Sequence, residues 1–157
     1  MIEINNLSRS LVDKRTLKAA AEIVLRGERK KSAELSIVLT GESEIKKINK
    51  KYRKKNKATD VLSFGSDKKF ISPANDLGEV VICLSVVKKN AEKFDSSFKE
   101  ELARVLIHGI LHLLGYEHER GGEKAEKMAE KEKYYLSKLN PVKLSRFQRD
   151  TASLLRS

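Results

Sequence analysis

The sequence predicts one α+β domain in which a small mixed β-sheet packs with about five helices. Strand-like segments are concentrated in the first half of the chain and helix-like segments in the second, in the order β α β α β β α α α. The 157 residues are about one domain's length when ~150 residues per domain is taken as a guide. We therefore expect a single domain over residues 1–140 and a basic C-terminal tail over residues 141–157.

The first half of the chain opens with strand and helix signals in alternation. Ile2 and Ile4 alternate with polar residues and predict a short strand. Residues 11–26 repeat apolar side chains at helical spacing and predict the first helix. Residues 33–40 form a largely apolar run, which predicts a second strand that Gly41 ends.

Residues 42–52 predict a helix with one apolar stripe that includes Ile45 and Tyr52. The lysines of this helix lie largely off the stripe, and they begin a basic run that continues into a loop. The run contains no acidic residue, and its basic members are Lys46, Lys47, Lys50, Lys51, Arg53, Lys54, Lys55 and Lys57. Such a run is either a solvated helix face or a surface for a polyanion.

Two further strands are predicted over residues 59–64 and 78–84, separated by a loop with glycine, proline and asparagine. Ser85 is placed to cap a helix that runs to about Phe94. Cys83 is the only cysteine and cannot form an internal disulfide. Its apolar neighbours predict a buried side chain.

The strongest helix signal starts at Ser97. Ser97 and Glu100 have the spacing of a capping box, an apolar stripe follows, and Gly115 is suited to end the helix. A last helix, rich in Glu and Lys, is predicted over about residues 123–139 and ends before Pro141.

The overall charge favours polyanionic partners: 33 Lys and Arg against 22 Asp and Glu give a formal net charge of +11. The longest stretch without a charged residue, residues 105–116, is well short of the ~20 apolar residues of a membrane-spanning helix. The first residues lack the basic, apolar and small-residue order of a secretory signal. We expect a cytoplasmic protein with no membrane span.

The three histidines of the chain all lie in or just after the strongest helix, at His108, His112 and His118. His108 and His112 are four residues apart, so their rings leave one helix face about one turn apart. Gly115 permits a backbone reversal that would bring His118 round as a third ligand. Three neutral imidazoles suit one Zn²⁺ per chain and leave a fourth position for water. The alternative is that His108 and His112 are core histidines, which the spacing of all three disfavours.

This histidine helix is similar to that of zinc peptidases, in which Glu follows the first histidine and deprotonates the bound water. Here that position is Gly109, which cannot act as a base, so peptidase activity is disfavoured. A metal alone can lower the pKa of bound water to ~7, so hydrolysis remains open. Glu117 is the nearest alternative carboxylate, with either a direct role or a role that orients a histidine.

Residues 108–118, HGILHLLGYEH, resemble the HGxLHLxGYDH signature of the YbeY family, also described as the rRNA maturation factor family. The one departure is Glu117, where the family usually has Asp. Three upstream segments also resemble the family, N-x-x-Y-R at residues 49–53, T-[ND]-V-L-S-F at residues 59–64 and L-G-[DE]-[IL]-x-I at residues 77–82. The similarity covers roughly residues 35–139.

The resemblance implies a single-strand-specific, metal-dependent endoribonuclease that processes the 3′ end of the small-subunit rRNA precursor and serves ribosome quality control. It implies zinc ligands at His108, His112 and His118 and a functional Arg53. The guanidinium of Arg53 could hold a phosphate and stabilise its developing charge; the alternative is an ordinary surface arginine. The expected partner is RNA, with ribosomal proteins or the small ribosomal subunit as further partners.

We therefore predict Arg53, His112 and Glu117 as catalytic residues, and an RNA-binding surface made of Lys50, Lys51, Arg53, Lys54 and Lys55. Aromatic residues are only 6% of the chain and Trp is absent, so base stacking is not expected to dominate binding. Core packing is the expected use of the aromatic residues in the matched segments, Tyr52, Phe64 and Tyr116. The alternative function is a non-catalytic, zinc-containing RNA-binding factor of ribosome biogenesis.

Overall fold

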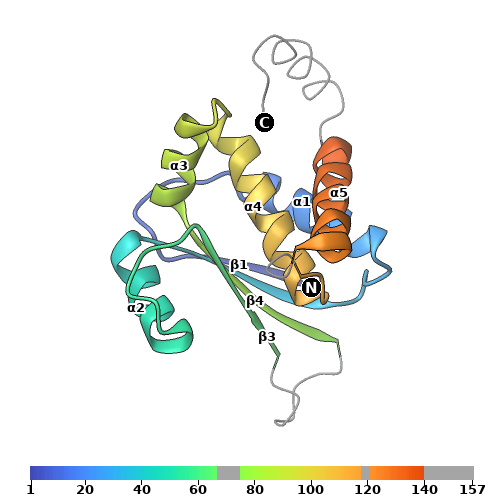
Figure 1. The fold of residues 1–157 in the computed structure, drawn as a ribbon, viewed down its shortest axis with the longest axis horizontal. Coiled ribbons are helices and arrows are strands. Elements are labelled where there is room, and N and C mark those ends of the chain that lie inside the picture. The colour runs from blue at the N-terminus through green and yellow to red at the C-terminus, as the bar shows by residue number, and fades with distance from the viewer. Residues whose placement is uncertain (67–74, 118–120, 140–157) are drawn as a thin grey trace.

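The computed structural model of the protein describes residues 1–66, 75–117 and 121–139. His118 and residues 140–157, including the expected tail, lie outside the described residues. The elements follow the predicted order (Figure 1): β1 (Ile2–Asn6), α1 (Lys14–Gly27), β2 (Glu34–Thr40), α2 (Glu42–Arg53), β3 (Val61–Gly65), β4 (Asp76–Cys83), α3 (Leu84–Lys93), α4 (Phe98–Leu113) and α5 (Gly122–Leu139). The prediction of a single α+β domain with a mixed sheet and five helices is confirmed.

The sheet has the strand order β1-β2-β4-β3. β1 pairs with β2 and β2 with β4 in parallel, whereas β3 pairs with β4 in antiparallel orientation. The two parallel pairings are joined through helices, and the apolar runs of β2 and β4 fit strands that are covered on both faces. β3 is left as an edge strand, and this edge borders the candidate site described below.

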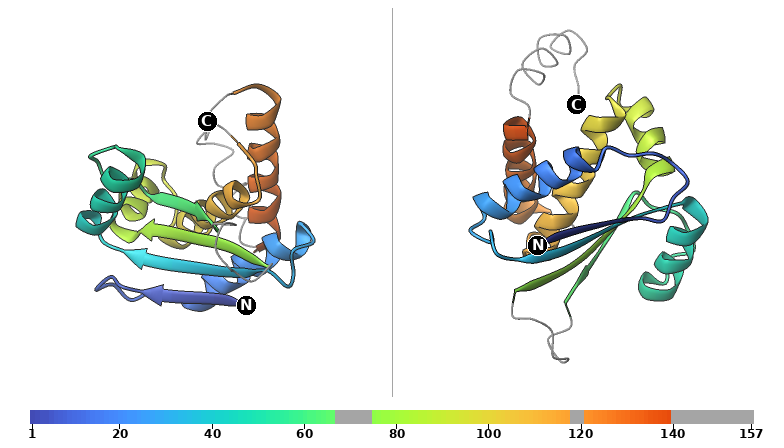
Figure 2. Two further views of the ribbon diagram at one scale, coloured as in Figure 1. Left: turned by 90° about the horizontal axis from the view of Figure 1, so that it is seen from below. Right: turned by 180° about the vertical axis from the view of Figure 1, so that it is seen from behind.

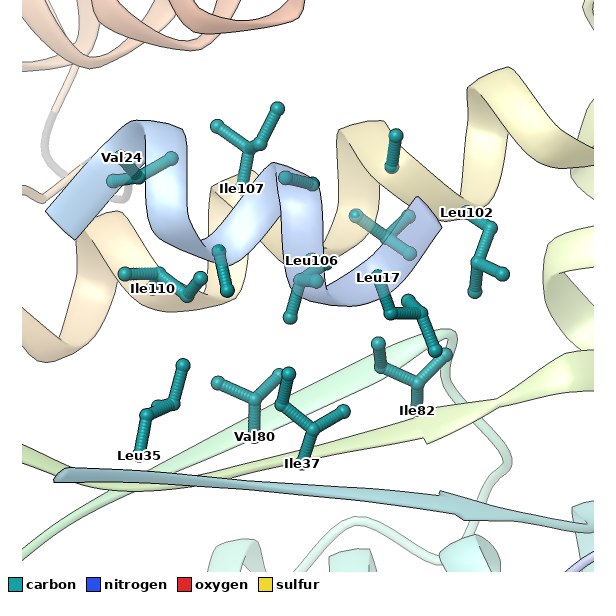
Figure 3. Packing of buried hydrophobic residues seen from close by; sticks show 14 of the residues in the cluster. Leu17, Val24, Leu35, Ile37, Val80, Ile82, Leu102, Leu106, Ile107 and Ile110 are labelled. Atoms are coloured by element: carbon teal, nitrogen blue, oxygen red, sulfur yellow. The ribbon is translucent and has the colours of Figure 1, made fainter. Parts of the chain in front are cut away.

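The main core lies between the sheet and a layer of helices on one of its faces (Figures 1 and 2). α4 is the central helix of this layer, because Leu106, Ile107 and Ile110 are fully buried. Figure 3 shows α4 and α1 above the sheet, with Leu106, Ile110 and Leu17 directed toward the apolar side chains of β2 and β4. α2 covers part of the other face, where Ile45 and Cys83 belong to a smaller buried cluster. The burial of Cys83 is confirmed.

Helix starts were predicted less well than helix faces. The first helix begins at Lys14 because the Asp13 carboxylate accepts a hydrogen bond from the Arg15 backbone N–H, and Leu11 is fully exposed. Ser85 does not cap α3, because β4 runs directly into α3 with Cys83 at the N-cap position and no side-chain cap. The cap at Ser97 is confirmed, since its hydroxyl accepts a hydrogen bond from the Glu100 backbone N–H at 3.1 Å.

No helix in the described parts of the chain has the length and apolar character needed to cross a membrane.

Candidate active site

A cleft of about 860 Å³ lies where the C-terminal ends of α2 and α4 meet the edge strand β3. Histidines from α4 and basic residues from α2 and the loop after it share its lining. The lining residues that carry ionisable side chains are Arg53, Lys55, Lys57, Asp60, His108, His112, Tyr116 and Glu117. Groups from distant parts of the sequence therefore meet at one place.

His108 and His112 lie side by side in this cleft, as their spacing predicts. Their ring centroids are 4.8 Å apart and the ring planes are inclined by 79°. Within residues 1–66, 75–117 and 121–139, no three His, Cys, Asp or Glu side chains form a group that could hold a metal ion. The predicted third ligand, His118, lies outside these residues, so the three-histidine set stays a prediction.

Glu132, a carboxylate that was not predicted as a site residue, orients His108. A hydrogen bond of 3.0 Å joins Nδ1 of His108 to Oε2 of Glu132, on α5. The other oxygen of Glu132 accepts a hydrogen bond of 3.0 Å from Nη1 of Arg104. Arg104 also donates through Nε to the buried Glu101 at 2.8 Å. Two acidic residues thus share one arginine, and one of them also holds a histidine.

This network favours an ionised Glu132. Burial opposes the charge, but the hydrogen bond and charge of His108 and the charge of Arg104 outweigh it and lower the pKa of Glu132. An ionised carboxylate can only accept, so Nδ1 of His108 carries the hydrogen atom of this bond, and in the neutral imidazole Nε2 then keeps its lone pair. An imidazole held in this way presents Nε2 as a potential metal ligand.

Arg53 lies along the outer edge of β3. Its Nη2 donates to the carbonyl oxygen of Ser63 at 2.8 Å, and its guanidinium carbon is 5.3 Å from the centroid of the Phe64 ring. These two contacts hold an exposed arginine on the cleft wall, where a guanidinium can bind a phosphate through two parallel hydrogen bonds. The structure places Arg53 in the same cleft as His108 and His112.

Only part of the basic run contributes to the lining of the cleft. Lys55 and Lys57 line the cleft, whereas the exposed Lys50, Lys51 and Lys54 do not. α2 ends because Lys54 adopts a left-handed conformation, with φ of 58°. The buried Asn49 then donates to the carbonyl oxygen of Lys57 at 2.9 Å and fixes the loop. Lys57 is not among the residues predicted to bind RNA.

The turn after α4 brings Glu117 to the cleft wall. Gly115 has a φ of +99°, a conformation that a residue with a Cβ rarely adopts. Tyr116 then donates from its hydroxyl to Oε1 of Glu28 at 2.6 Å. This bond, with burial, raises the pKa of Tyr116 to about 12. The carboxylate that bonds to His108 is Glu132, while the exposed Glu117 faces the cleft.

The family model described as "Endoribonuclease YbeY" matches residues 3–140. The chain belongs to the YbeY family. A relative named "Endoribonuclease YbeY" from Aquifex aeolicus (strain VF5) is 42% identical, covering 85% of this chain and 89% of the relative. One of the same name from Persephonella marina is 47% identical, covering 74% and 77%. The solution structure of TM1509 from Thermotoga maritima matches with a TM-score of 0.65, 32% identity and 93% coverage of both chains.

Membership of the YbeY family agrees with the resemblance seen in the signature, and the structure explains the glycine within it. A Cβ on Gly109 would lie 2.8 Å from Cγ1 of Val80 and 3.2 Å from Oγ of Ser63. Gly109 therefore faces the sheet rather than the cleft, and its absent side chain lets α4 approach β3 and β4. The Ser63 hydroxyl uses this approach and donates to the Gly109 carbonyl oxygen at 2.9 Å.

Proposed function

We propose that this protein is a metal-dependent endoribonuclease that cleaves single-stranded RNA in the cleft between α2, β3 and α4. The observation that carries the proposal is the meeting of two imidazoles with three cationic side chains in one cleft. The phosphodiester backbone of RNA supplies the negative charge that Arg53, Lys55 and Lys57 would bind. The names of the relatives, "Endoribonuclease YbeY", support the same activity.

We further propose that the cofactor is one Zn²⁺ per chain, held by His108, His112 and His118. The donor chemistry of the described pair fits, because the rings are neighbours and Glu132 holds Nδ1 of His108 so that Nε2 can ligate. When bound, the ion would polarise the scissile phosphate and lower the pKa of water. His118 would be the third ligand of this set.

We assign a different role in RNA cleavage to each group of cleft residues. Arg53 would bind non-bridging phosphate oxygens and stabilise charge that develops there, while the Ser63 carbonyl keeps its guanidinium in place. Glu117 would accept or donate a proton near the scissile bond. Lys55 and Lys57 would attract the RNA backbone without reading its sequence.

The physiological substrate that we propose is the rRNA precursor at the 3′ end of the small-subunit rRNA, with a further role in ribosome quality control in the cytoplasm. Ribosomal proteins or the small ribosomal subunit would then be partners. The support is the match of the family's sequence segments to residues that line the cleft, among them Arg53, Thr59, His108 and His112.

Replacing His112 with Ala tests the activity. We expect the purified, folded His112→Ala variant to lose RNA cleavage while keeping the single-stranded RNA affinity of the wild type, because the basic wall is unchanged. Cleavage of a labelled RNA and binding of an uncleavable analogue measure the two properties. Equal cleavage by wild type and variant would refute the proposal. Binding without any cleavage by zinc-loaded wild type would favour the non-catalytic RNA-binding factor.

A further inference from the structure

Tyr52 is a large aromatic side chain that the fold leaves in solvent. It lies in the last turn of α2 and is 59% exposed, although the helical stripe predicts it in the core. The same stripe buries Ile45 and Asn49, so only its end leaves the protein interior. The next residue, Arg53, lines the cleft. Arg53 packs on the ring of Phe64, which the Tyr52 ring also contacts, so the exposed ring lies beside the proposed RNA site.

The ring of Tyr52 belongs to a cluster of two aromatic and two cationic side chains, Lys51, Tyr52, Arg53 and Phe64, which we call the rim cluster. The rings of Tyr52 and Phe64 meet edge to face, with centroids 5.4 Å apart and planes inclined by 65°. The ammonium of Lys51 is 5.2 Å from the Tyr52 centroid, and the guanidinium carbon of Arg53 is 5.3 Å from that of Phe64. The contact with Phe64 orients a ring that is otherwise open to solvent.

We propose that Tyr52 is a stacking subsite for an unpaired nucleobase of the RNA bound in the cleft; this rests on the proposed function. Any base offers a π-face, so stacking on tyrosine needs no particular sequence. Bases within a duplex are already stacked on each other, so the subsite would act only on single strands. Lys51 and Arg53 flank the ring with the positive charge that the neighbouring phosphates require.

The chain contains a matched control on the far side of the molecule. Tyr134 of α5 is 52% exposed, meets Tyr135 edge to face at 5.2 Å, and has the ammonium of Lys138 at 5.3 Å from its ring centroid. α2 and α5 lie on opposite sides of the molecule in Figures 1 and 2. Tyr134 thus has nearly the same local surroundings as Tyr52, but its helix contributes no residue to the lining of the histidine cleft.

The test compares Tyr52→Leu with Tyr134→Leu in the full chain. The probes are a short 2′-O-methyl single strand, which resists cleavage, and an abasic strand of equal length and charge, both measured by fluorescence anisotropy at one salt concentration. We expect Tyr52→Leu to raise the Kd of the base-bearing strand by roughly fivefold to a hundredfold. The Kd of the abasic strand and of a duplex should stay within about twofold. Tyr134→Leu should change none of them.

Tyr52→Phe keeps the ring. If this variant also keeps its affinity for the base-bearing strand, that result would support stacking further. Equal losses for base-bearing and abasic strands on Tyr52→Leu would overturn the subsite, because the ring would then act only through the shape of the cationic surface. No loss on Tyr52→Leu would overturn it as well. Both results leave cleavage by the wild type intact, so they are distinct from failure of the proposed function, in which the wild type does not cleave RNA.

Discussion

The two walls of the cleft are built in different ways. The α4 wall places His108 in a partly buried network in which Glu132 binds both the histidine and Arg104. The α2 and β3 wall carries exposed lysines and an arginine held by one hydrogen bond and one ring contact. A buried network fixes geometry, whereas long exposed side chains can follow a flexible polyanion. The first wall is suited to chemistry and the second to binding.

This difference also predicts how each wall responds to substitution. Removing one partner of a buried charged network leaves the others unpaired, so its effects are large and local. Removing an exposed lysine costs a screened, graded amount that depends on salt. Substitutions on the α4 wall should therefore act through metal binding and fold, and those on the basic wall through RNA affinity.

Among substitutions that distinguish the two walls, we expect Glu132→Gln to have the largest effect, on zinc affinity. A glutamine cannot accept hydrogen bonds from both His108 and Arg104 with two oxygens, so the orientation of His108 is weakened. We expect zinc affinity to fall by roughly 10- to 100-fold, measured by competition with a chromophoric chelator. The control is Glu130→Gln, an exposed position of the same helix, which should keep wild-type affinity. Equal zinc affinities in the two variants would remove the role assigned to Glu132.

A smaller effect is expected on the basic wall, where two lysine pairs of equal charge can be compared. Lys55 and Lys57 line the cleft, while Lys46 and Lys47 lie on the preceding helix outside it. Replacing the first pair with Ala should weaken single-stranded RNA binding and flatten the slope of log K against log salt by about 0.7 for each phosphate that is no longer neutralised. Replacing the second pair with Ala should change the RNA affinity and the salt slope much less. Equal effects would mean that net charge, and not the cleft, sets RNA affinity.

Local periodicity predicted most of the helices and strands and the shared face of the two histidines in the site. His108 and His112 share a face because that spacing is a property of any helix. Glu132 could not be singled out, because it lies on a helix rich in Glu and Lys, where every carboxylate looks alike until α5 docks on α4. The expected burial of Tyr52 was wrong for a similar reason. A stripe predicts which face turns inward, but not where the sheet beneath it ends.

Loop geometry set the other limits of prediction. Ser85 was expected to cap the helix, but β4 continues directly into α3, which begins at Leu84. Lys57 lines the cleft from a loop that Asn49 holds by a hydrogen bond to the Lys57 carbonyl oxygen. Both depend on contacts that form after the elements pack, and neither leaves a periodic signal in the sequence.

The smallest expected effect concerns Glu28, which joins the α4 wall to the rest of the fold. It accepts hydrogen bonds from the hydroxyls of Tyr116 and Tyr135 and from Lys131. Burial opposes its charge, but these three partners outweigh burial and lower the pKa of Glu28 below 4.5. A carboxylate with a lowered folded-state pKa adds stability above the unfolded-state pKa, and this stability is lost as the pH falls.

Glu28→Gln should therefore reduce the free energy of unfolding by about 1 kcal/mol near neutral pH, because the amide keeps an acceptor but loses the charge. The difference in unfolding free energy between variant and wild type should become smaller as the pH falls below about 4.5, where protonation of the wild-type carboxylate removes its stabilising charge. Denaturant unfolding at neutral and acidic pH measures this gap. The exposed Glu22 of α1 supplies the control, since Glu22→Gln should leave stability unchanged at both pH values. A gap that widens on acidification would contradict an ionised Glu28 as the anchor of Tyr116.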